Sequence, residues 1–119
     1  MRSTRLSPSD ALAGLPGPAG ERYTTLLRHG TLEVEYYAPR GHDPQSPHRR
    51  DELYVVVSGR GEFVHDGRRT PFSPGDCLFV AAGIEHRFER FSDDFGAWVF
   101  FYGPDGGELE PSIGPDGSK

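Results

Sequence analysis

Two histidines and one glutamate stand at spacings that suit a metal site. His48 lies four residues before Glu52, and His86 follows a turn at Gly83. Imidazole nitrogens and a carboxylate oxygen together bind divalent transition metals, and a set of two histidines and one carboxylate leaves coordination positions open. The three residues therefore predict one divalent transition metal, and Fe, Mn, Zn and Ni are all compatible with these donors.

The residues around Glu52 indicate that its side chain points inward. Glu52, Tyr54 and Val56 share one face of a strand, because side chains two residues apart do so. Val56 is apolar, so this face is the interior, where a glutamate is costly unless it is paired or binds a metal. His48 lies at an even offset from Glu52 and is expected on the same face. Tyr54 is therefore a candidate catalytic residue beside the metal.

Arg90 is the second candidate catalytic residue. It shares a face with His86 if residues 86–91 form a strand. A guanidinium pointing inward would bind a substrate carboxylate through two hydrogen bonds. A salt bridge at the rim, with Glu89 or Asp93, is the alternative.

The elements that must position these residues read as eight short strands. Alternating apolar and polar residues recur between turn signals, and Asp66-Gly67 is typical of a tight type I′ hairpin turn. The expected strands are 22–27, 32–36, 52–58, 62–65, 68–72, 77–80, 86–91 and 97–102. This pattern, without a long helix, predicts an all-β antiparallel barrel or jelly-roll sandwich. The predicted core is mainly aromatic: Phe63, Phe72, Phe79, Phe88, Trp98, Phe100 and Tyr102.

Both ends of the chain differ in composition from the middle. The 119 residues include 27 Gly and Pro, which are concentrated near the two termini. Three segments are expected: a flexible N-terminal segment 1–20, a barrel domain 21–102 and a flexible C-terminal tail 103–119. Within the first, Ser7 could cap one or two helical turns, with Pro8 at the first helical position.

The two segments that hold the metal candidates resemble the two conserved motifs of the cupin superfamily. In the first, His48 is followed by three residues, Glu52, six residues and Gly59. In the second, Gly75 is followed by five residues, Ala81-Ala82-Gly83, two residues and His86. The chain is similar to a small single-domain cupin over residues 30–102. The resemblance implies a double-stranded β-helix with His48, Glu52 and His86 as metal ligands.

The chain departs from the family pattern at one ligand position. The family's first histidine would fall at position 46, where this chain has Ser46. Either the three remaining ligands hold the metal alone, or Gln45 or His42 replaces the missing donor, or the site is empty. Ala81 and Arg90 also stand where the family has Pro and Asn.

Composition limits the remaining choices. A net charge of −5 without a basic stripe argues against nucleic acid, and no apolar run is long enough for a membrane helix. The single Cys77 is expected to be a buried structural cysteine, and one cysteine suits the cytoplasm. Exposed strand edges predict a homodimer, with residues 22–27 as the candidate contact.

The resemblance implies a metal-dependent activity on a small molecule. Two neutral imidazoles and one carboxylate around a divalent ion leave a net charge of about +1, which favours an anionic metabolite. A dioxygenase or isomerase type of enzyme is the expectation, and the open coordination positions favour oxygenase chemistry slightly. Two alternatives stay open: a non-catalytic small-molecule binding module, and a cupin that has lost its metal. The sequence does not identify the substrate.

Overall fold

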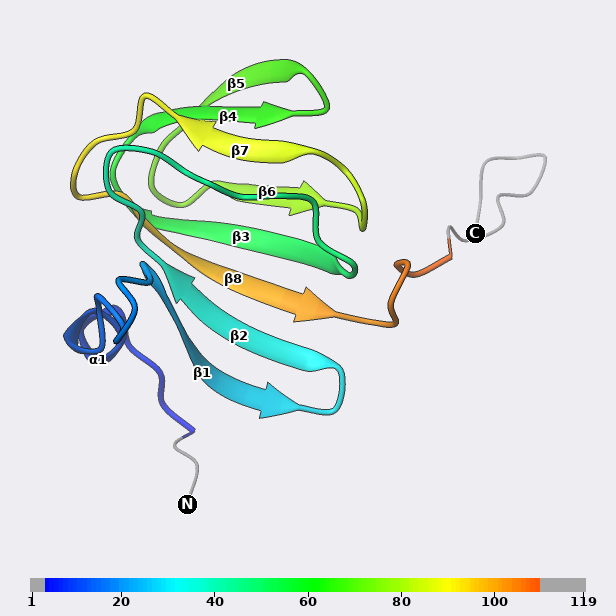
Figure 1. Cartoon of the computed structure of the whole chain (residues 1–119), viewed down its shortest axis with the longest axis horizontal. Helices are drawn as coiled ribbons and strands as arrows, with labels where there is room; N and C mark the ends of the chain where they lie inside the picture. The colour runs from blue at the N-terminus through cyan, green and yellow to red at the C-terminus, as the bar shows by residue number, and fades with distance from the viewer. Residues whose placement is uncertain (1–3, 110–119) are drawn as a thin grey trace.

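Among the described residues, eight antiparallel strands form two sheets that enclose the core (Figure 1). The computed structural model describes residues 4–109. Within these residues, the larger sheet has five strands and the smaller sheet has three. This arrangement is the predicted all-β jelly-roll barrel with one short helix. Residues 110–119 of the predicted tail lie outside the described residues.

The observed elements follow the expected ones within a few residues. They are α1 (Pro8–Ala13), β1 (Tyr23–His29), β2 (Leu32–Tyr37), β3 (Asp51–Ser58), β4 (Gly61–His65), β5 (Arg68–Phe72), β6 (Cys77–Val80), β7 (His86–Glu89) and β8 (Gly96–Tyr102). The larger sheet has the strand order β1-β2-β8-β3-β6, and the smaller sheet has the order β5-β4-β7.

The backbone explains where two of these elements turn or end. Asp66 and Gly67 have φ values of 50° and 82°, which confirms the predicted type I′ turn between β4 and β5. Strand β7 was expected to reach Phe91 but ends at Glu89. Arg90 adopts a φ of 52°, which is incompatible with an extended strand and turns the chain away from the sheet.

Aromatic side chains fill the space between the two sheets. Tyr54 from β3 packs edge-on against Phe88 from β7, with ring centroids 5.0 Å apart. Full burial of one such side chain contributes about 1.5–3 kcal/mol to stability. The core consists of Tyr37, Tyr54, Val56, Phe63, Phe72, Val80, Phe88, Phe95, Ala97, Val99 and Phe101. The expectation of core positions is confirmed for Phe63, Phe72 and Phe88.

A second apolar cluster lies on the outer face of the larger sheet. Ser7 caps α1 by accepting a hydrogen bond from the Asp10 N–H, and Ala11 is buried against Tyr36. Tyr36 also contacts Trp98 edge-on at 5.1 Å. Part of the N-terminal segment is therefore packed on the barrel. Between residues 4 and 109, no helix has the length and apolar character needed to cross a membrane.

Strand β6 corrects two expectations. Its inner residues face the core, because Leu78 lies opposite Tyr54 in the ladder. Cys77 and Phe79 alternate with them and point outward, so Cys77 is exposed and Phe79 is 52% exposed. Both were expected to be buried. The four residues of β6 do not alternate between apolar and polar, so the sequence does not show which of them point outward. In addition, β6 lies at the edge of its sheet, where nothing in the described chain covers the outer face.

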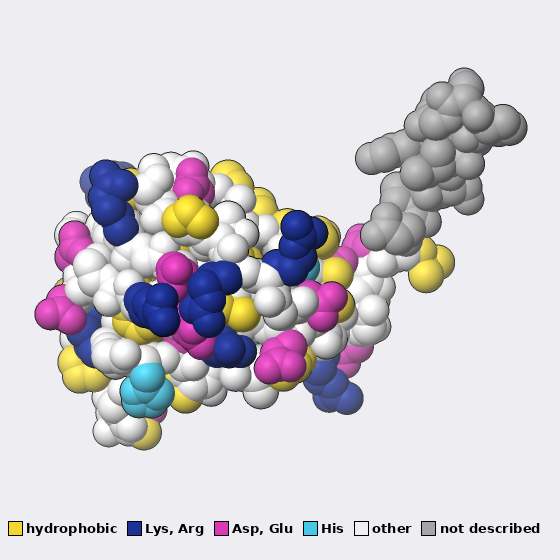
Figure 2. All heavy atoms as spheres, turned by 90° about the horizontal axis from the view of Figure 1, so that it is seen from above, with side chains coloured by type: hydrophobic (Ala, Val, Ile, Leu, Met, Phe, Trp, Pro, Cys, Tyr) yellow, Lys and Arg dark blue, Asp and Glu magenta, His cyan; other side chains and the backbone are white. Residues whose placement is uncertain are grey.

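The outer face of the smaller sheet carries interleaved charges. Figure 2, which looks down on the molecule from above, shows basic and acidic side chains side by side. Arg69 pairs with Glu62 at 3.1 Å and with Glu89 at 2.5 Å, and Arg90 pairs with Glu62 at 3.4 Å. The Arg90 side chain is 77% exposed. Arg90 therefore lies on the outer surface in a rim salt bridge, rather than inward as a carboxylate clamp would.

Candidate metal centre

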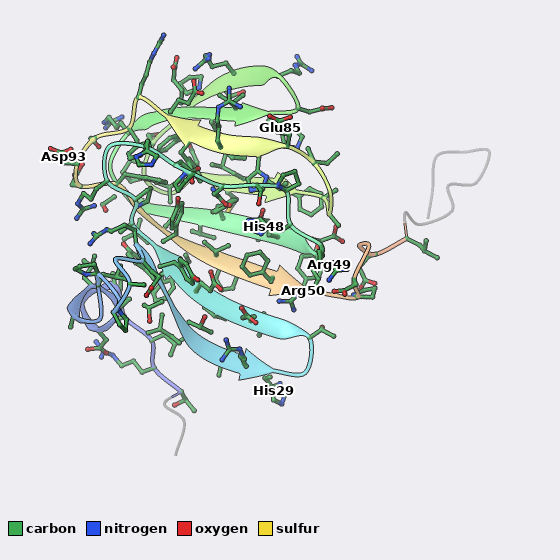
Figure 3. The ribbon with its side chains drawn as sticks, viewed as in Figure 1. His29, His48, Arg49, Arg50, Glu85 and Asp93 are labelled. Carbon is green, nitrogen blue, oxygen red and sulfur yellow. The ribbon has the colours of Figure 1, made fainter. Side chains whose placement is uncertain are left out.

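His48, Glu52 and His86 converge in the structure. One ligand atom from each lies within 4.8 Å of the other two. His48 lies in the loop before β3, Glu52 is the second residue of β3, and His86 is the first residue of β7. The cluster therefore joins the two sheets, and Figure 3 places His48 beside β3, far from the exposed His29 at the β1–β2 turn.

The carboxyl group of Glu52 is fully buried. Its exposed fraction is 0%, and neither Oε1 nor Oε2 has a hydrogen-bond partner among the described residues. Oε1 lies 2.7 Å from Nε2 of His86, within ion-pair distance when that imidazole is protonated. A buried carboxylate in this state is strongly unfavourable unless a cation compensates it. Its surroundings therefore fit a metal ligand.

His86 is held in the orientation that a ligand needs. Its Nδ1 lies 2.9 Å from the Ile84 carbonyl oxygen, to which an Nδ1–H donates. This leaves Nε2 facing Glu52 with its lone pair available to a metal. Burial disfavours the imidazolium form, but Glu52 and the Ile84 carbonyl outweigh it, so the pKa of His86 is raised.

His48 stands at the boundary between the cluster and solvent. Its side chain is 34% exposed, and its Nε2 lies 3.8 Å from Oε1 of Glu52. The ring packs edge-on against Phe101 with centroids 5.2 Å apart. Burial lowers the pKa of His48, and this favours the neutral imidazole that binds metals.

Gln45 presents an oxygen to the same place. Its Oε1 lies 3.0 Å from Nε2 of His48 and accepts a hydrogen bond from the Tyr54 hydroxyl at 2.9 Å. Its Nε2 donates to Oδ2 of Asp43 at 2.7 Å. The amide is therefore oriented with its oxygen toward the cluster. This geometry suits a weak, neutral oxygen donor in place of the histidine that Ser46 replaces.

Asp43 fixes the loop that carries Gln45. Its Oδ2 also accepts the backbone N–H of Phe88 at 2.8 Å, and its Oδ1 accepts the Tyr37 hydroxyl. Phe88 belongs to the smaller sheet and Tyr37 to the larger one. One carboxylate thus connects both sheets to the orientation of Gln45. Nothing in the local sequence indicates this role, because Phe88 reaches Asp43 only in the folded barrel.

Tyr54 lies against the cluster as predicted from its strand face. It is 1% exposed, and its hydroxyl oxygen is 3.2 Å from Nε2 of His86. Burial, reinforced by the negative charge of Glu52, raises the pKa of Tyr54 well above its ordinary value. The phenol therefore keeps its proton and acts as a hydrogen-bond donor.

Asp51, next to Glu52, anchors the start of the C-terminal segment. It is 5% exposed, and its two oxygens accept the backbone N–H groups of Ala82 and Glu108 at 2.9 and 2.8 Å. A Cβ on Gly107 would lie 2.9 Å from Oδ1 of Asp51. The described part of the predicted flexible tail, through residue 109, is therefore bonded to the strand that carries Glu52.

The backbone conformation explains why glycine occupies two positions of the motifs. Gly59, which follows β3, has a φ of 86°, and a Cβ there would lie 2.5 Å from the Phe95 Cα. Gly75 has a φ of 94° in the turn before β6, and its N–H donates to the Val56 carbonyl. Both glycines therefore occupy a backbone conformation that is unfavourable for a residue with a Cβ.

A cavity of about 780 Å³ adjoins the cluster. Its volume is in the range of small-molecule sites. Val99 and Phe101 form apolar parts of the wall, while His48, Gln45 and Tyr54 line the end nearest the cluster. The cavity could therefore admit a small molecule up to the candidate metal position.

The other predicted site residues lie apart from the cluster. His42 and Ser46 are both exposed, although both border the cavity. His42 does not belong to the group of candidate ligands found among residues 4–109. Of the two expected substitutes for the missing donor, Gln45 has its amide oxygen 3.0 Å from Nε2 of His48, whereas His42 is exposed.

Sequence reasoning also missed two acidic residues of the cavity wall. Glu33 and Glu35 were read as the polar face of a half-buried strand. Val34 and Tyr36 are indeed buried, but they lie on the outer face of the sheet. Glu33 and Glu35 lie on the inner face and line the cavity. The sequence shows the alternation of apolar and acidic residues, but it does not show which face of the strand points into the barrel.

Comparison with known proteins gives one family. Residues 33–102 match the family model Cupin_2, described as a cupin domain. The protein SCO3923 of Streptomyces coelicolor is 35% identical over 85 residues, which cover 70% of this chain and 81% of that protein.

Solved structures give the same fold. A Cupin 2 conserved barrel domain protein from Salinispora arenicola has a TM-score of 0.66 at 24% identity, covering 86% of this chain and 91% of that one. KdgF from a Halomonas species has a TM-score of 0.59 at 20% identity, covering 70% and 79%. The DMSP lyase DddQ from Ruegeria pomeroyi has a TM-score of 0.62 at 22% identity, covering 91% of this chain and 57% of the lyase.

Proposed function

The chain belongs to the cupin family, and we propose that it binds one divalent transition metal through His48, Glu52 and His86. The adjoining cavity then takes a small, anionic metabolite. The observation that carries this proposal is the fully buried Glu52, whose two oxygens have no hydrogen-bond partner among the described residues. A cation between Glu52 and the two imidazoles would remove that cost.

Gln45 is the proposed fourth donor. Its oxygen lies 3.0 Å from Nε2 of His48 and is turned toward the cluster by Asp43. Two neutral imidazoles, one carboxylate and a neutral amide would leave a divalent site with a net charge of about +1. A positive site favours an anionic ligand, which supports the small, anionic class of metabolite. Fe, Mn, Zn and Ni all accept this donor set.

We propose further that the protein is an enzyme of dioxygenase or isomerase type. A divalent metal bound there would polarise a substrate oxygen and leave coordination positions open. Tyr54 keeps its proton and can donate a hydrogen bond at the inner end of the cavity, while Val99 and Phe101 form apolar parts of its wall. Arg90 has no place in this proposal, because it lies outside the cavity.

Metal binding is tested on the purified full chain after treatment with a chelator. Zn(II), Mn(II) and Fe(II) are titrated separately, the last without oxygen, and the affinity is measured by calorimetry. One ion is expected per chain, and His86→Ala should weaken the affinity by well over the ~10–100-fold typical of a group that does not touch the metal. His29→Ala, an exposed histidine away from the cluster, is the matched control. Equal affinity in the His86 variant and the control would exclude this site.

A metal-free or non-catalytic cupin is the second candidate. The observation in its favour is Ser46, which is exposed and supplies no nitrogen donor where the family's first histidine would stand. A chain of this kind would bind a small molecule without turnover. Tight metal binding excludes the metal-free form, and consumption of oxygen or conversion of a substrate excludes the non-catalytic form.

The homodimer and the cytoplasmic location belong to the same proposal. Strand β1 lies at one edge of the larger sheet, and this supports the predicted contact through residues 22–27. A single cysteine suits a reducing compartment. No nucleic acid or membrane partner forms part of the proposal.

A further inference from the structure

Glu33 and Glu35 belong to the same face of the sheet as the metal cluster. Glu35 lies opposite Val99, which in turn lies opposite Tyr54, and directly paired residues share a face. In the neighbouring row, Glu33 lies opposite Phe101, which pairs with Glu52. Both glutamates line the cavity that also reaches His48, Gln45 and Tyr54. The wall of the cavity across from the cluster is therefore acidic.

The two glutamates differ in their partners. Oε2 of Glu33 pairs with Arg28 at 3.3 Å and with Arg50 at 3.4 Å. Glu35 instead accepts a hydrogen bond from the Thr25 hydroxyl at 3.4 Å, and no ion pair is recorded for it between residues 4 and 109. Two neighbouring carboxylates in a partly buried wall resist losing both protons. The arginines thus select Glu33 as the charged member and leave the proton on Glu35.

The shifts in pKa of the two glutamates agree with this assignment. Burial, and then the hydrogen bond and charge of Glu33, raise the pKa of Glu35 to about 7. Burial opposes the ionisation of Glu33, but its hydrogen bond with Glu35 and the two arginines outweigh it and lower its pKa. The charges of Glu33 on its own strand and of Glu52 on β3 both raise the pKa of Glu35, and the cavity is also lined by Arg22, Arg40 and Arg50. On the flanking strands, the residues directly opposite are Thr25 and Val99, which do not titrate.

The distance across the sheet suits a small ligand that reaches both walls. Strand β8 separates β2 from β3. Glu35 and Tyr54 are therefore two strand spacings apart, or about 10 Å between backbones. The two side chains extend into the same cavity of about 780 Å³. A molecule with polar groups at both ends could contact Glu35 and the cluster together.

On the basis of the proposed function of the cluster, we propose that Glu35 is the proton-exchanging carboxyl group of this cavity. In the resting protein it holds a proton that it shares with Glu33. It donates this proton to a basic oxygen or nitrogen of a ligand bound between β2 and the cluster, and the ligand gains the hydrogen as Glu35 becomes a carboxylate. The reverse transfer restores the carboxyl group. The ligand class is a small anion whose basic atom lies on the side away from the cluster.

The test follows the carboxyl groups directly by NMR, in full-length protein with carbon-13-labelled glutamate. One glutamate should titrate near neutral pH in the wild type, and this transition should be absent in Glu35→Gln. Glu62→Gln, on the outer face of the smaller sheet, is the matched control and should keep it. Glu33→Gln removes the neighbouring charge and should lower the midpoint by about one pH unit. Absence of any near-neutral glutamate, or its persistence in folded Glu35→Gln, overturns the proposal.

Zn(II) separates this inference from the metal proposal. A cation at the cluster, about 10 Å from Glu35, should lower the midpoint of the Glu35 titration by about 0.5–1 pH unit. Zn(II) that binds without moving the midpoint shows that Glu35 does not face the cluster, and this overturns the proposal. Failure of Zn(II) to bind overturns the metal proposal instead. The proposal for Glu35 is then judged only by whether a glutamate of the wild type titrates near neutral pH. If Glu35→Gln does not fold, the shift of the titration midpoint in Glu33→Gln decides between the outcomes.

Discussion

The side-chain amide of Gln45 donates from Nε2 to Oδ2 of Asp43 over 2.7 Å, and this bond turns its oxygen toward the metal candidates. An amide can rotate so that its nitrogen and oxygen exchange places, and only its hydrogen-bond partners decide the orientation. Asp43 is a pure acceptor when ionised, so it accepts the NH₂ group and excludes the oxygen. The fourth donor of the candidate site therefore depends on a residue that does not belong to the cluster.

Asp43→Asn should weaken metal binding by about 10–100-fold. The asparagine has one acceptor oxygen instead of two, and its NH₂ group favours the flipped orientation of Gln45. Adding Gln45→Glu to this variant should restore the affinity, because a glutamate presents an oxygen to the cluster in either orientation and accepts from Asn at position 43. Calorimetric titration with Zn(II) measures the effect. Asp93→Asn, in an exposed loop, is the control, and failure of the double variant to recover affinity would contradict the orienting role.

Glu35→Gln should make the free energy of unfolding less sensitive to a rise in pH from 4.5 to 8. The pKa of Glu35 is raised in the folded protein to about 7, from an ordinary value of 4.5. A raised carboxyl pKa stabilises the fold fully below pH 4.5, and this contribution is lost as the pH rises through 7. Relative to Glu35→Gln, the wild type should therefore lose about 2 kcal/mol between pH 4.5 and pH 8, after allowance for solvent screening. Urea unfolding at both pH values measures this difference, and a constant difference would argue against it.

Gly59→Ala should destabilise the protein more than Gly67→Ala. Both glycines have a positive φ, which costs about 1–2 kcal/mol for a residue with a Cβ. At Gly59 the added Cβ would also lie 2.5 Å from the Phe95 Cα, whereas at Gly67 it meets nothing within 4 Å. Thermal unfolding should show a loss of about 3 kcal/mol or more for Gly59→Ala. Equal losses in the two variants would mean that the backbone near Phe95 adjusts freely.

The two edges of the larger sheet offer a comparison for the predicted homodimer. Tyr23 on β1 is 49% exposed and Phe79 on β6 is 52% exposed. If residues 22–27 form the contact, Tyr23→Ser should raise the dimer dissociation constant by at least about tenfold, because tyrosines often dominate interfaces. Phe79→Ser at the opposite edge should leave it unchanged. Sedimentation equilibrium distinguishes the two, and the reverse result would place the contact on β6.

The spacing of His48, Glu52 and His86 was sufficient to predict the cluster, because strand periodicity and two motifs act locally. Asp43 could not be found in the same way. Its role depends on Phe88 and Tyr37, which reach it only in the folded barrel.

Strand β2 shows the limit of a periodic pattern. Alternation correctly predicted that one face carries Val34 and Tyr36 and the other Glu33 and Glu35. It could not predict that α1 helps to cover the apolar face while the acidic face lines the cavity, because the same pattern suits a barrel with either face inward. Cys77 was misplaced for a related reason, since an edge strand can leave apolar residues exposed.

The bond between Asp51 and Glu108 has a practical consequence for anyone who shortens this chain for crystallisation or spectroscopy. Composition alone suggests trimming after Gly103, where Gly and Pro become frequent. Such a cut would remove the N–H that Oδ2 of Asp51 accepts at 2.8 Å, one residue from Glu52. Shortened versions should therefore retain the residues through Leu109, so that a loss of metal binding in them is not mistaken for a property of the native site.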